Sequence, residues 1–281
     1  MLQYIYISYE KILTIGGIFM NTIKRVQIIS NRKKTSIDTK NEIENIGRSF
    51  GYEIVDFDPD IVIAVGGDGT FISAVHKSKF NANARYLGVN TGHFGFLQDI
   101  NKSDIQNLFK YLNSHKVSIS KINVLTIDIC NRKDFHYLRK ALNEIVVKNK
   151  QLKTLKCELF LNYEHLETSR GDGFIVSTAT GSTAYSMSSG GAIILADLPV
   201  LQIIPCAPIS NGAYNCIKNP IIFDKKVSIR PEGNILLTID GRPSEIKDIK
   251  EITINIGQYT ITRLNLGDMS SVKRLKNKFL K

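Results

Sequence analysis

Cysteine and histidine are scarce in this sequence, which has four cysteines and five histidines in 281 residues. The cysteines show no CxxC spacing and stand mostly among apolar residues, as expected of reduced thiols in a cytoplasmic protein. The histidines are scattered, and only His93 falls within a motif. This pattern gives no support for a zinc site. We therefore expect a cytoplasmic protein that carries no structural zinc.

Long apolar runs are also missing. No apolar stretch reaches the roughly 20 residues that span a bilayer, so no transmembrane helix is predicted. Residues 1–19 lack the basic start and the small-residue cleavage site of a signal peptide, and they contain Glu10 and Lys11. We treat 1–19 as an extension, because the first clean strand pattern follows Met20. A chain that begins at Met20 is predicted to fold and to keep its activity.

Acidic residues are outnumbered, since 37 Lys and Arg against 26 Asp and Glu give a net charge of +11. This balance favours an anionic partner: a nucleotide, polyphosphate, nucleic acid or acidic lipid. Part of the excess lies near the C-terminus, in a run without acidic neighbours. The run consists of Lys273, Arg274, Lys276, Lys278 and Lys281. We interpret it as a solvated helix or tail.

Residues 20–118 alternate strand and helix patterns, which predicts a doubly wound α/β domain. Strands are expected at 26–30, 52–57, 61–65 and 85–89, and helices at 36–50, 70–79 and 103–113. The last helix is expected to be capped by Ser103 and to bury Ile105, Leu108, Phe109 and Leu112.

From residue 119 the apolar period changes to two, which predicts a β-rich, sandwich-like second domain over 119–281. Strands are expected within 117–129 and at 142–147, 157–161, 173–177, 227–229, 235–239, 252–256 and 260–265. The segment of about 266–281 is expected to pack back on the first domain.

The segment GGDGT at 66–70 follows the apolar run 61–65, so a buried strand leads into a glycine turn that carries one carboxylate. Glycines let backbone N–H groups approach an anion, and the helix expected from Thr70 points its positive end at the same place. Asp68 would be out of place in a turn that held only phosphate. We expect it to meet a hydroxyl, a metal ion or both.

Three further segments carry polar or glycine-rich patterns. NTGHFGFL at 90–97 follows another strand and predicts either a floor for a flat ring or a tight turn that buries Phe94 and Phe96. Asn143 and Glu144 interrupt an apolar run; they would suit ribose hydroxyls, or they would end a strand in solvent. Residues 170–191 combine glycines with Ser, Thr, Asp172 and Tyr185, which favours a donor-rich surface for a nucleotide over a plain Ser/Thr loop.

In order and spacing, six segments resemble the NAD kinase family: GGDGT at 66–70, NTGHFGFL at 90–97, ALNE at 141–144, RGDG at 170–173, TATGSTAYSMSSGG at 178–191 and TIDGR at 238–242. The resemblance covers nearly the whole chain after Met20. GGDG alone is shared with diacylglycerol-type lipid kinases and phosphofructokinases, whereas its combination with ALNE and TGSTAY is highly specific.

The resemblance implies transfer of the γ-phosphate of ATP, or of a phosphate from polyphosphate, to the 2′-hydroxyl of the adenosine ribose of NAD. Asp68 is then the catalytic carboxylate, acting beside a divalent metal ion, expected to be Mg²⁺, and mainly by positioning. Its replacement by Asn is expected to lower turnover while the fold hardly changes. The implied binding residues are Gly67, Gly69, Thr70, His93, Phe94, Asn143, Glu144, Arg170, Asp172, Thr183, Ala184, Tyr185, Ser188 and Ala207.

Family members are usually homodimers or homotetramers in which a neighbouring subunit completes the site, and neither nucleic acid nor a membrane takes part. Two other functions stay open at this point. A lipid kinase would share the GGDG turn but would need a surface for acyl chains. A noncatalytic nucleotide or nucleic-acid binder would explain the charge of +11, but it would leave Asp68, Glu144 and Asp172 as repulsive charges.

Overall fold

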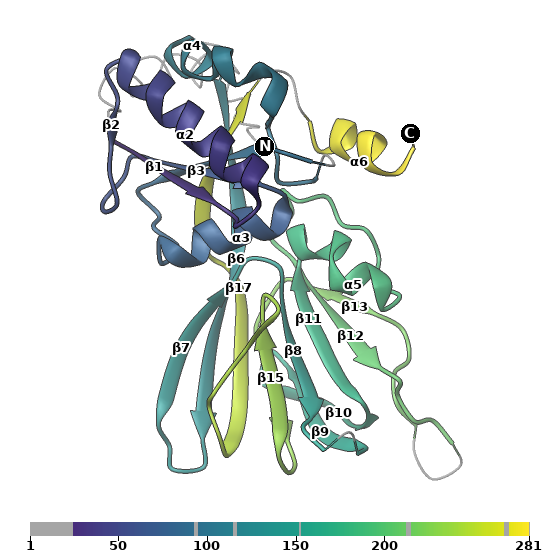
Figure 1. The fold of residues 1–281 in the computed structure, drawn as a ribbon. Helices are drawn as coiled ribbons and strands as arrows, with labels where there is room; N and C mark the ends of the chain where they lie inside the picture. The colour runs from purple at the N-terminus through teal and green to yellow at the C-terminus, as the bar shows by residue number, and fades with distance from the viewer. Residues whose placement is uncertain are drawn as a thin grey trace, which may run out of the picture. The chain divides into compact units, whose positions relative to one another are not determined.

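A computed structural model of the chain describes residues 25–92, 95–114, 117–151, 153–211, 215–266 and 270–280. The chain forms two compact units (Figure 1). Unit 1 consists of residues up to Lys121 together with those from Ile261 onward, and unit 2 consists of Ile122–Thr260. The extension 1–19 lies outside the described residues.

Unit 1 is built on a parallel sheet. Its strands are β1 (Arg25–Ser30), β2 (Glu53–Ile54), β3 (Ile61–Gly66), β4 (Arg85–Asn90) and the end of β17 (Ile249–Leu266), in the order β17-β4-β3-β1-β2, with β5 (Ile100–Asn101) also on β4. Every residue of β3 is buried, as expected for the centre of a sheet covered on both faces.

Three helices cover this sheet: α2 (Lys34–Ser49), α3 (Asp68–Lys77) and α4 (Leu108–Asn113), the last with a preceding 3₁₀ turn η1 (Lys102–Asn107). A further helix, α6 (Ser271–Phe279), follows β17 and is mostly exposed. The chain moves through the sheet in one direction across α2 and in the other across α3, so right-handed crossovers place these helices on opposite faces (Figure 1). The buried stripe of α4 and η1 lies in the core of this unit as predicted.

Three local predictions for unit 1 need correction. Helix α3 begins at Asp68 rather than Thr70, because Gly67 already takes the extended N-cap conformation. The expected helix 103–113 is a 3₁₀ turn followed by an α-helix, so Ser103 lies inside the turn and Asn101 precedes it without a side-chain cap. Strand β2 has two residues only, since the polar segment after Ile54 leaves the sheet.

Unit 2 consists of two sheets. One has the order β10 (Glu164–Gly171), β9 (Leu155–Leu161), β14 (Val227–Pro231), β17, β6 (Val117–Asn131) and β7 (His136–Ala141). The other has the order β13 (Ile221–Phe223), β12 (Leu201–Cys206), β11 (Gly173–Thr178), β8 (Glu144–Asn149), β15 (Ile235–Ile239) and β16 (Arg242–Pro243). Two short turns of helix follow β11: η2 (Thr180–Thr183) and α5 (Tyr185–Ser188).

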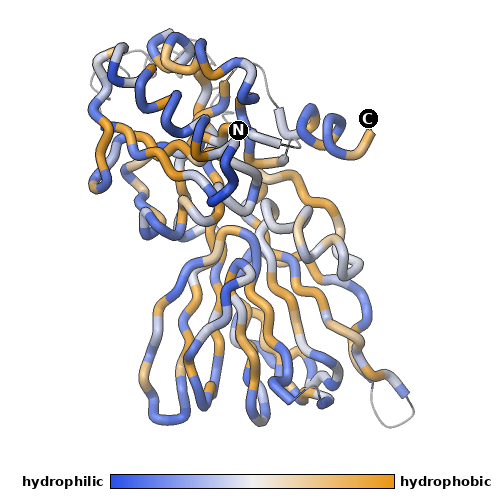
Figure 2. Tube along the Cα trace, viewed as in Figure 1, coloured by the Kyte–Doolittle hydropathy of each residue, from blue (hydrophilic) through white to orange (hydrophobic). Residues whose placement is uncertain are grey.

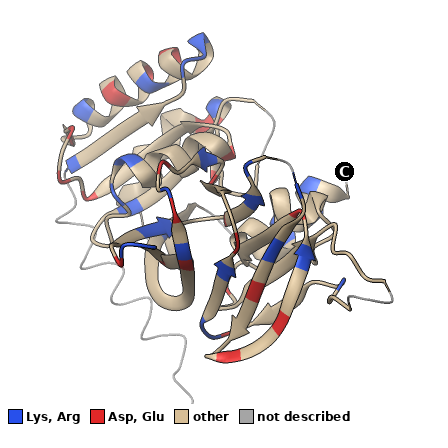
Figure 3. Cartoon of the chain, turned by 90° about the horizontal axis from the view of Figure 1, so that it is seen from below, with Lys and Arg blue, Asp and Glu red and all other residues tan. Residues whose placement is uncertain are grey.

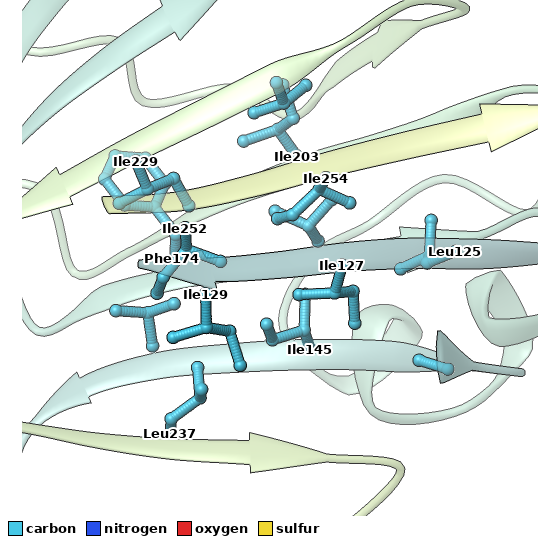
Figure 4. Close-up of a cluster of buried hydrophobic side chains, with 14 of the residues drawn as sticks. Leu125, Ile127, Ile129, Ile145, Phe174, Ile203, Ile229, Leu237, Ile252 and Ile254 are labelled. Carbon is cyan, nitrogen blue, oxygen red and sulfur yellow. The ribbon is translucent and has the colours of Figure 1, made fainter. Parts of the chain in front are cut away.

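The two sheets enclose one apolar core (Figure 4). Ile127 and Ile254 come from one sheet, and Ile145, Phe174 and Ile203 come from the other. Figure 2 shows the hydrophobic residues along these strands and hydrophilic residues at the far end of the β6–β7 hairpin. The predicted fold class, a doubly wound α/β part followed by a β-rich sandwich, is confirmed.

The sequence pattern did not predict β7, β10, β12 or β13. Strands β7 and β10 are mostly exposed and carry few apolar residues, and β12 contains Pro205, which disfavours a central strand. The strands expected at 252–256 and 260–265 are one strand, β17. Gly257 lies within it at φ +79°, a conformation that glycine adopts without strain.

Candidate functional site

The candidate site of unit 1 lies at the carboxyl ends of three neighbouring parallel strands. Strand β1 ends before Asn31, β3 ends in the glycine turn, and β4 ends at Asn90. Asn31 donates to the Thr70 hydroxyl at 3.2 Å, which ties the first strand end to the second. Ligands bind at this edge in open α/β sheets. Asn31 escaped the sequence analysis, although its position directly after β1 was a usable signal.

The glycines of the turn have different structural roles. A Cβ at Gly66 would lie 2.2 Å from the Thr70 hydroxyl oxygen, and Gly66 has φ +155°, so no other residue fits there. A Cβ at Gly67 or Gly69 would meet nothing within 4 Å. These two positions therefore leave room for a ligand in front of the N-terminus of α3, where the helix dipole favours an anion.

Asp68 is the first residue of α3, and its carboxylate faces the segment that follows β4. Oδ2 accepts from the Phe96 N–H at 3.0 Å, and Oδ1 accepts from the Leu97 N–H at 2.9 Å and from the Gln98 amide at 3.4 Å. A Cβ at Gly95 would lie 2.2 Å from Asp68 Oδ1. The carboxylate thus holds this segment instead of capping its own helix.

This contact changes the interpretation of the segment 90–97. His93 and Phe94 lie outside the described residues. Gly95 and Leu97 are buried, and Phe96 is half-buried against the ring of Phe279 at a centroid distance of 5.5 Å. The prediction that Asp68→Asn would hardly affect the structure stays a prediction, but these contacts argue for a local effect on this segment, because the amide would face a backbone N–H in place of one oxygen.

The candidate site of unit 2 begins at the start of β8. Asn143 and Glu144 are both buried, with 8% and 7% of their surface exposed, so neither ends a strand in solvent. The Asp240 carboxylate accepts from the backbone N–H groups of Leu142, Asn143 and Glu144 at 2.8, 2.7 and 3.2 Å. The backbone is thereby fixed. Asn143 Oδ1 and Glu144 Oε2 are buried acceptors without a hydrogen-bond partner within the part of the chain that the structure describes.

Burial, and after it the nearby Asp240 carboxylate, raises the pKa of Glu144 to about 7. The ionised and neutral forms of this carboxyl are therefore both present near neutral pH. A buried carboxyl of this kind, next to an unpartnered amide oxygen, fits a ligand that brings its own hydroxyl donors.

The hydroxyl-rich segment after β11 is partly structural. Thr178 donates to the Leu142 carbonyl at 2.7 Å and accepts from the Gly181 N–H at 2.9 Å. A Cβ at Gly181 would lie 2.2 Å from the Asn143 carbonyl oxygen, so glycine lets this turn lie directly on the start of β8. Thr183 is half-buried and donates to the Thr180 carbonyl. Ala184 is half-buried, and Ser188 is exposed.

Tyr185 is exposed, and its hydroxyl accepts a hydrogen bond from Lys148 Nζ at 3.0 Å. This bond raises the pKa of Lys148, and the charge of the nearby Asp172 contributes to the same shift. The sequence analysis missed Lys148. Because side chains alternate along a strand, Lys148 shares the outer face of β8 with Glu144 and Val146, and period-two counting from Glu144 would have found it.

The remaining predicted residues lie at the junctions of β10, β11 and β12. Arg170 is the penultimate residue of β10 and is half-buried, while Asp172 is exposed and its N–H donates to the Cys206 carbonyl at 2.8 Å. Ala207 is exposed and has φ +44°, an unfavourable conformation for alanine. Backbone strain of this kind is frequent at functional sites.

Among the described residues, no group of three or more His, Cys, Asp or Glu side chains could hold a metal ion. Asp68 is the one carboxylate within the glycine turn 66–70. A single carboxylate fits Mg²⁺, which commonly binds one or two carboxylates and takes its other ligands from substrate phosphates and water.

No helix in the described ranges is long and apolar enough to cross a membrane.

Comparisons with known proteins agree over both units. The family model for the ATP-NAD kinase N-terminal domain matches residues 11–117, and that for the ATP-NAD kinase C-terminal domain matches residues 142–265. The NAD kinase of Lactobacillus gasseri is 35% identical over 242 residues, covering 84% of this chain and 90% of that protein. The NAD kinase of Lactococcus lactis subsp. cremoris is 31% identical over 267 residues, covering 93% and 98%.

Two solved structures share the fold. Yeast NADH kinase, complexed with NADH, superposes with a TM-score of 0.81 at 19% identity and covers 92% of this chain and 88% of its own. An NAD kinase from Archaeoglobus fulgidus, in complex with ATP, superposes with a TM-score of 0.68 at 24% identity. The match covers 91% of this chain and 97% of the archaeal chain.

Proposed function

Because the chain belongs to the ATP-NAD kinase family, we propose that it transfers the terminal phosphoryl group of ATP to the 2′-hydroxyl of the adenosine ribose of NAD. Membership confirms the resemblance drawn from the ordered motifs. It also gives the enzyme class, a phosphotransferase that acts on NAD.

The glycine turn supports a role for Asp68 as the catalytic carboxylate. Phosphoryl transfer requires alignment of the acceptor hydroxyl, neutralisation of charge and a proton acceptor late in the reaction. The carboxylate of Asp68 is fixed by the N–H groups of Phe96 and Leu97, and beside it Gly67 and Gly69 leave open space. This fixed carboxylate next to an open anion turn is the observation on which the proposal rests. Thr70 then orders the turn through Asn31.

In unit 2 we propose that Asn143 and Glu144 accept hydrogen bonds from the hydroxyls of an NAD ribose. Their unpartnered buried oxygens support this role, since a ribose offers two neighbouring donors. Recognition through buried polar groups is selective, because a ligand without the hydroxyls would leave these oxygens unsatisfied.

The other residues on the outer side of unit 2 would complete dinucleotide binding. Tyr185 offers an exposed ring, and Ala207 holds a strained turn. We propose that these two, with Arg170, Asp172, Thr183, Ala184 and Ser188, line the dinucleotide site. His93 and Phe94 keep their proposed place at its border on the basis of the motif alone.

We propose that Mg²⁺ takes part. Asp68 would hold it together with the phosphates of the nucleotide, because an ionised carboxylate has about four lone-pair positions and its three protein donors leave capacity. When bound, the ion neutralises charge on the phosphate oxygens. Asp68 itself orients the acceptor hydroxyl and receives its proton.

We further propose a homodimer or homotetramer. Helix α5 and the segment after it expose apolar side chains, including Met187, Ile193, Leu195 and Leu198. Apolar side chains gathered in one segment suit contact with a second copy of the chain. Sedimentation at several protein concentrations would report the assembly, and a monomer at all concentrations would contradict it.

One assay tests the reaction. The purified chain is incubated with NAD or NADH and with ATP or polyphosphate, and NADP or NADPH is measured. We expect NADP from NAD and ATP, with no product when Mg²⁺ is replaced by a chelator. Absence of product with every pair of substrates would overturn the proposed function.

A variant tests the role of Asp68. Asp68→Asn should lower kcat by roughly 10² or more, because it removes the charge and the proton acceptor. NAD binding, measured by calorimetry, should stay within a few-fold of the wild type. Asp38→Asn, at an exposed position of α2, is the matched control. Unchanged turnover in Asp68→Asn would remove Asp68 from the mechanism.

A further inference from the structure

Two arginines are buried behind the segment that Asp68 holds. Arg263 lies on β17 and Arg274 on α6, with 6% and 7% of their surface exposed. Both donate to the same oxygen, Oδ1 of Asp99, at 2.9 and 2.7 Å. Arg274 corrects the sequence analysis, which placed the whole basic run of the C-terminal segment in solvent. Within that run Lys273, Lys276 and Lys278 are exposed, but Arg274 is buried.

The arginines also bind the backbone of the segment that contacts Asp68. The Phe96 carbonyl accepts from Arg263 Nη1 at 3.2 Å and from Arg274 Nη1 at 3.1 Å. The Gln98 carbonyl accepts from both arginines as well. Arg274 Nη2 also donates to the Asn265 side chain at 3.2 Å. The planar guanidinium of Arg274 thus meets four acceptors, which a lysine ammonium in the same place could not reproduce.

One peptide group connects the arginines to Asp68. The carbonyl of Phe96 and the N–H of Leu97 belong to the same planar amide. Its oxygen accepts from the two guanidinium groups, and its N–H donates to Asp68 Oδ1 at 2.9 Å. Cations at the oxygen polarise the amide and strengthen its N–H as a donor. The charges of Arg263 and Arg274 therefore act on Asp68 through a single peptide.

Among the described residues, Asp68 is the carboxylate that balances the charges of this cluster together with Asp99. Two buried guanidinium groups face one fully buried carboxylate, Asp99. Burial and the neighbouring Arg263 lower the pKa of Arg274, while Asp99 and then Asp68 raise it. Buried charges require partners. Within the described part of the chain, Asp68 is thus the carboxylate that acts on the arginine pair in addition to Asp99.

From this chain of contacts we infer that Arg274 is a positioning residue for the reaction: it fixes the Phe96–Leu97 peptide, and through it the carboxylate of Asp68. Helix α6 therefore supports the glycine turn and is more than a solvated tail. The inference rests on the proposed function, in which Asp68 is the catalytic carboxylate. A misplaced catalytic group costs turnover, whereas residues that bind NAD in unit 2 are unaffected.

Three variants of the full chain test this role. Arg274→Gln removes both the positive charge and the planar guanidinium group. Arg274→Lys keeps the charge but lacks the guanidinium, and Lys278→Gln removes a charge from an exposed position of the same helix. We expect Arg274→Gln to lower kcat by about 10-fold or more with KM for NAD within about 3-fold. Arg274→Lys should restore part of kcat, and Lys278→Gln should match the wild type.

Amide hydrogen exchange provides a readout independent of activity. In Arg274→Gln, or in Arg274→Lys if the first variant does not fold, the Leu97 and Phe96 amides should exchange faster than in the wild type, while amides of β8 keep their protection. Unchanged kcat, an equal change in kcat and KM, or unchanged exchange at these amides would overturn the inference. A wild type that forms no NADP would refute the proposed function instead, and the exchange result would still decide whether Arg274 fixes the segment.

Discussion

Two carboxyl groups, Asp68 in the candidate site of unit 1 and Glu144 in that of unit 2, differ in the donors that they meet. Asp68 accepts three hydrogen bonds from the segment after β4. Glu144 is buried beside the carboxylate of Asp240, and its Oε2 has no hydrogen-bond partner among the described residues. The carboxylate of Asp68 therefore has a fixed orientation, whereas the carboxyl group of Glu144 can accept a further hydrogen bond.

The raised pKa of Glu144 predicts a pH-dependent stability of the free protein. Between pH 4.5 and about 7 the folded state keeps a proton that the unfolded chain has lost, so the free energy of unfolding falls as pH rises through this window. The full effect is at most about 3 kcal/mol. Glu144→Gln removes it, so the variant should gain stability relative to the wild type from pH 5 to pH 8.

Urea unfolding at several pH values measures this difference. Glu164→Gln, at an exposed position of β10 in the same unit, is the control and should run parallel to the wild type. A difference between Glu144→Gln and the wild type that is constant with pH would show that Glu144 titrates at the same pH in the folded and unfolded chains.

The sequence indicated some of these residues and missed others, for a physical reason. Asp68 and Glu144 stand within local patterns, a glycine turn and a polar break in an apolar strand. Asn31, Lys148 and Arg274 act through partners distant in sequence: Thr70, Tyr185 and Phe96 respectively. A single basic residue in a basic run looks solvated unless the tertiary fold is known.

At the scale of elements, the turn after β15 holds the start of β8. Asp240 lies in this turn at φ +48° and accepts from three successive backbone N–H groups. The backbone at the start of β8, and with it the positions of the two buried acceptors on Asn143 and Glu144, thus depends on the turn after the neighbouring strand β15.

Replacement of Asp240 tests this clamp. Asp240→Ala should destabilise the protein by about 3 kcal/mol, because three N–H groups lose a charged acceptor and alanine disfavours positive φ. Asp240→Asn tolerates the conformation and keeps one acceptor, so its loss should be smaller. Urea unfolding measures both. Equal stability of Asp240→Ala and the wild type would mean that the three N–H groups find other acceptors.

Elements were predictable where burial imposed a clear period. Strand β3 and the stripe on α4 were found because their apolar residues are buried on the expected faces. Strands β7 and β10 are mostly exposed and pair through backbone hydrogen bonds. Such pairing does not require an alternating pattern of apolar side chains, so the sequence does not reveal these strands. The start of α3 was misplaced by two residues because Gly67 serves as N-cap without a side chain.

At the scale of the whole molecule, charge and chain order stand out. Figure 3 shows Lys and Arg residues on both units instead of on a single element. In chain order, unit 2 is continuous, whereas unit 1 is made of two pieces. The described core residues of unit 2 come from one continuous stretch of chain, while those of unit 1 come from both of its pieces and include Leu264 and Leu266 of the second piece.

Fragments should reflect this organisation. The fragment 122–260 should fold cooperatively by itself, because it contains its complete core. The fragment 1–121 should not, because β4 loses its β17 partner and the core loses Leu264 and Leu266. Circular dichroism with thermal melting tests both. Absence of a cooperative transition in 122–260 would contradict the prediction.

A joined chain is the control for the first piece. Lys121 donates to the Thr262 hydroxyl at 2.7 Å, so a short Gly/Ser linker can connect residue 121 to residue 261. The joined chain should regain a cooperative transition that 1–121 lacks. If 1–121 alone melts as cooperatively as the joined chain, the C-terminal piece is dispensable for this core.

The split of unit 1 also has a consequence for the ribosome. Translation delivers all of unit 2 between the two pieces of unit 1, an interval on the order of ten seconds or more. Until Thr262 and Arg263 emerge, β4 lacks its neighbours opposite Arg85 and Tyr86, and Asp68 lacks the arginines behind its supporting peptide. A nascent chain that has already made its glycine turn thus still lacks both arginine donors to the Phe96 carbonyl, and under the proposed role of Arg274 we expect phosphoryl transfer to begin only after α6 has left the ribosome.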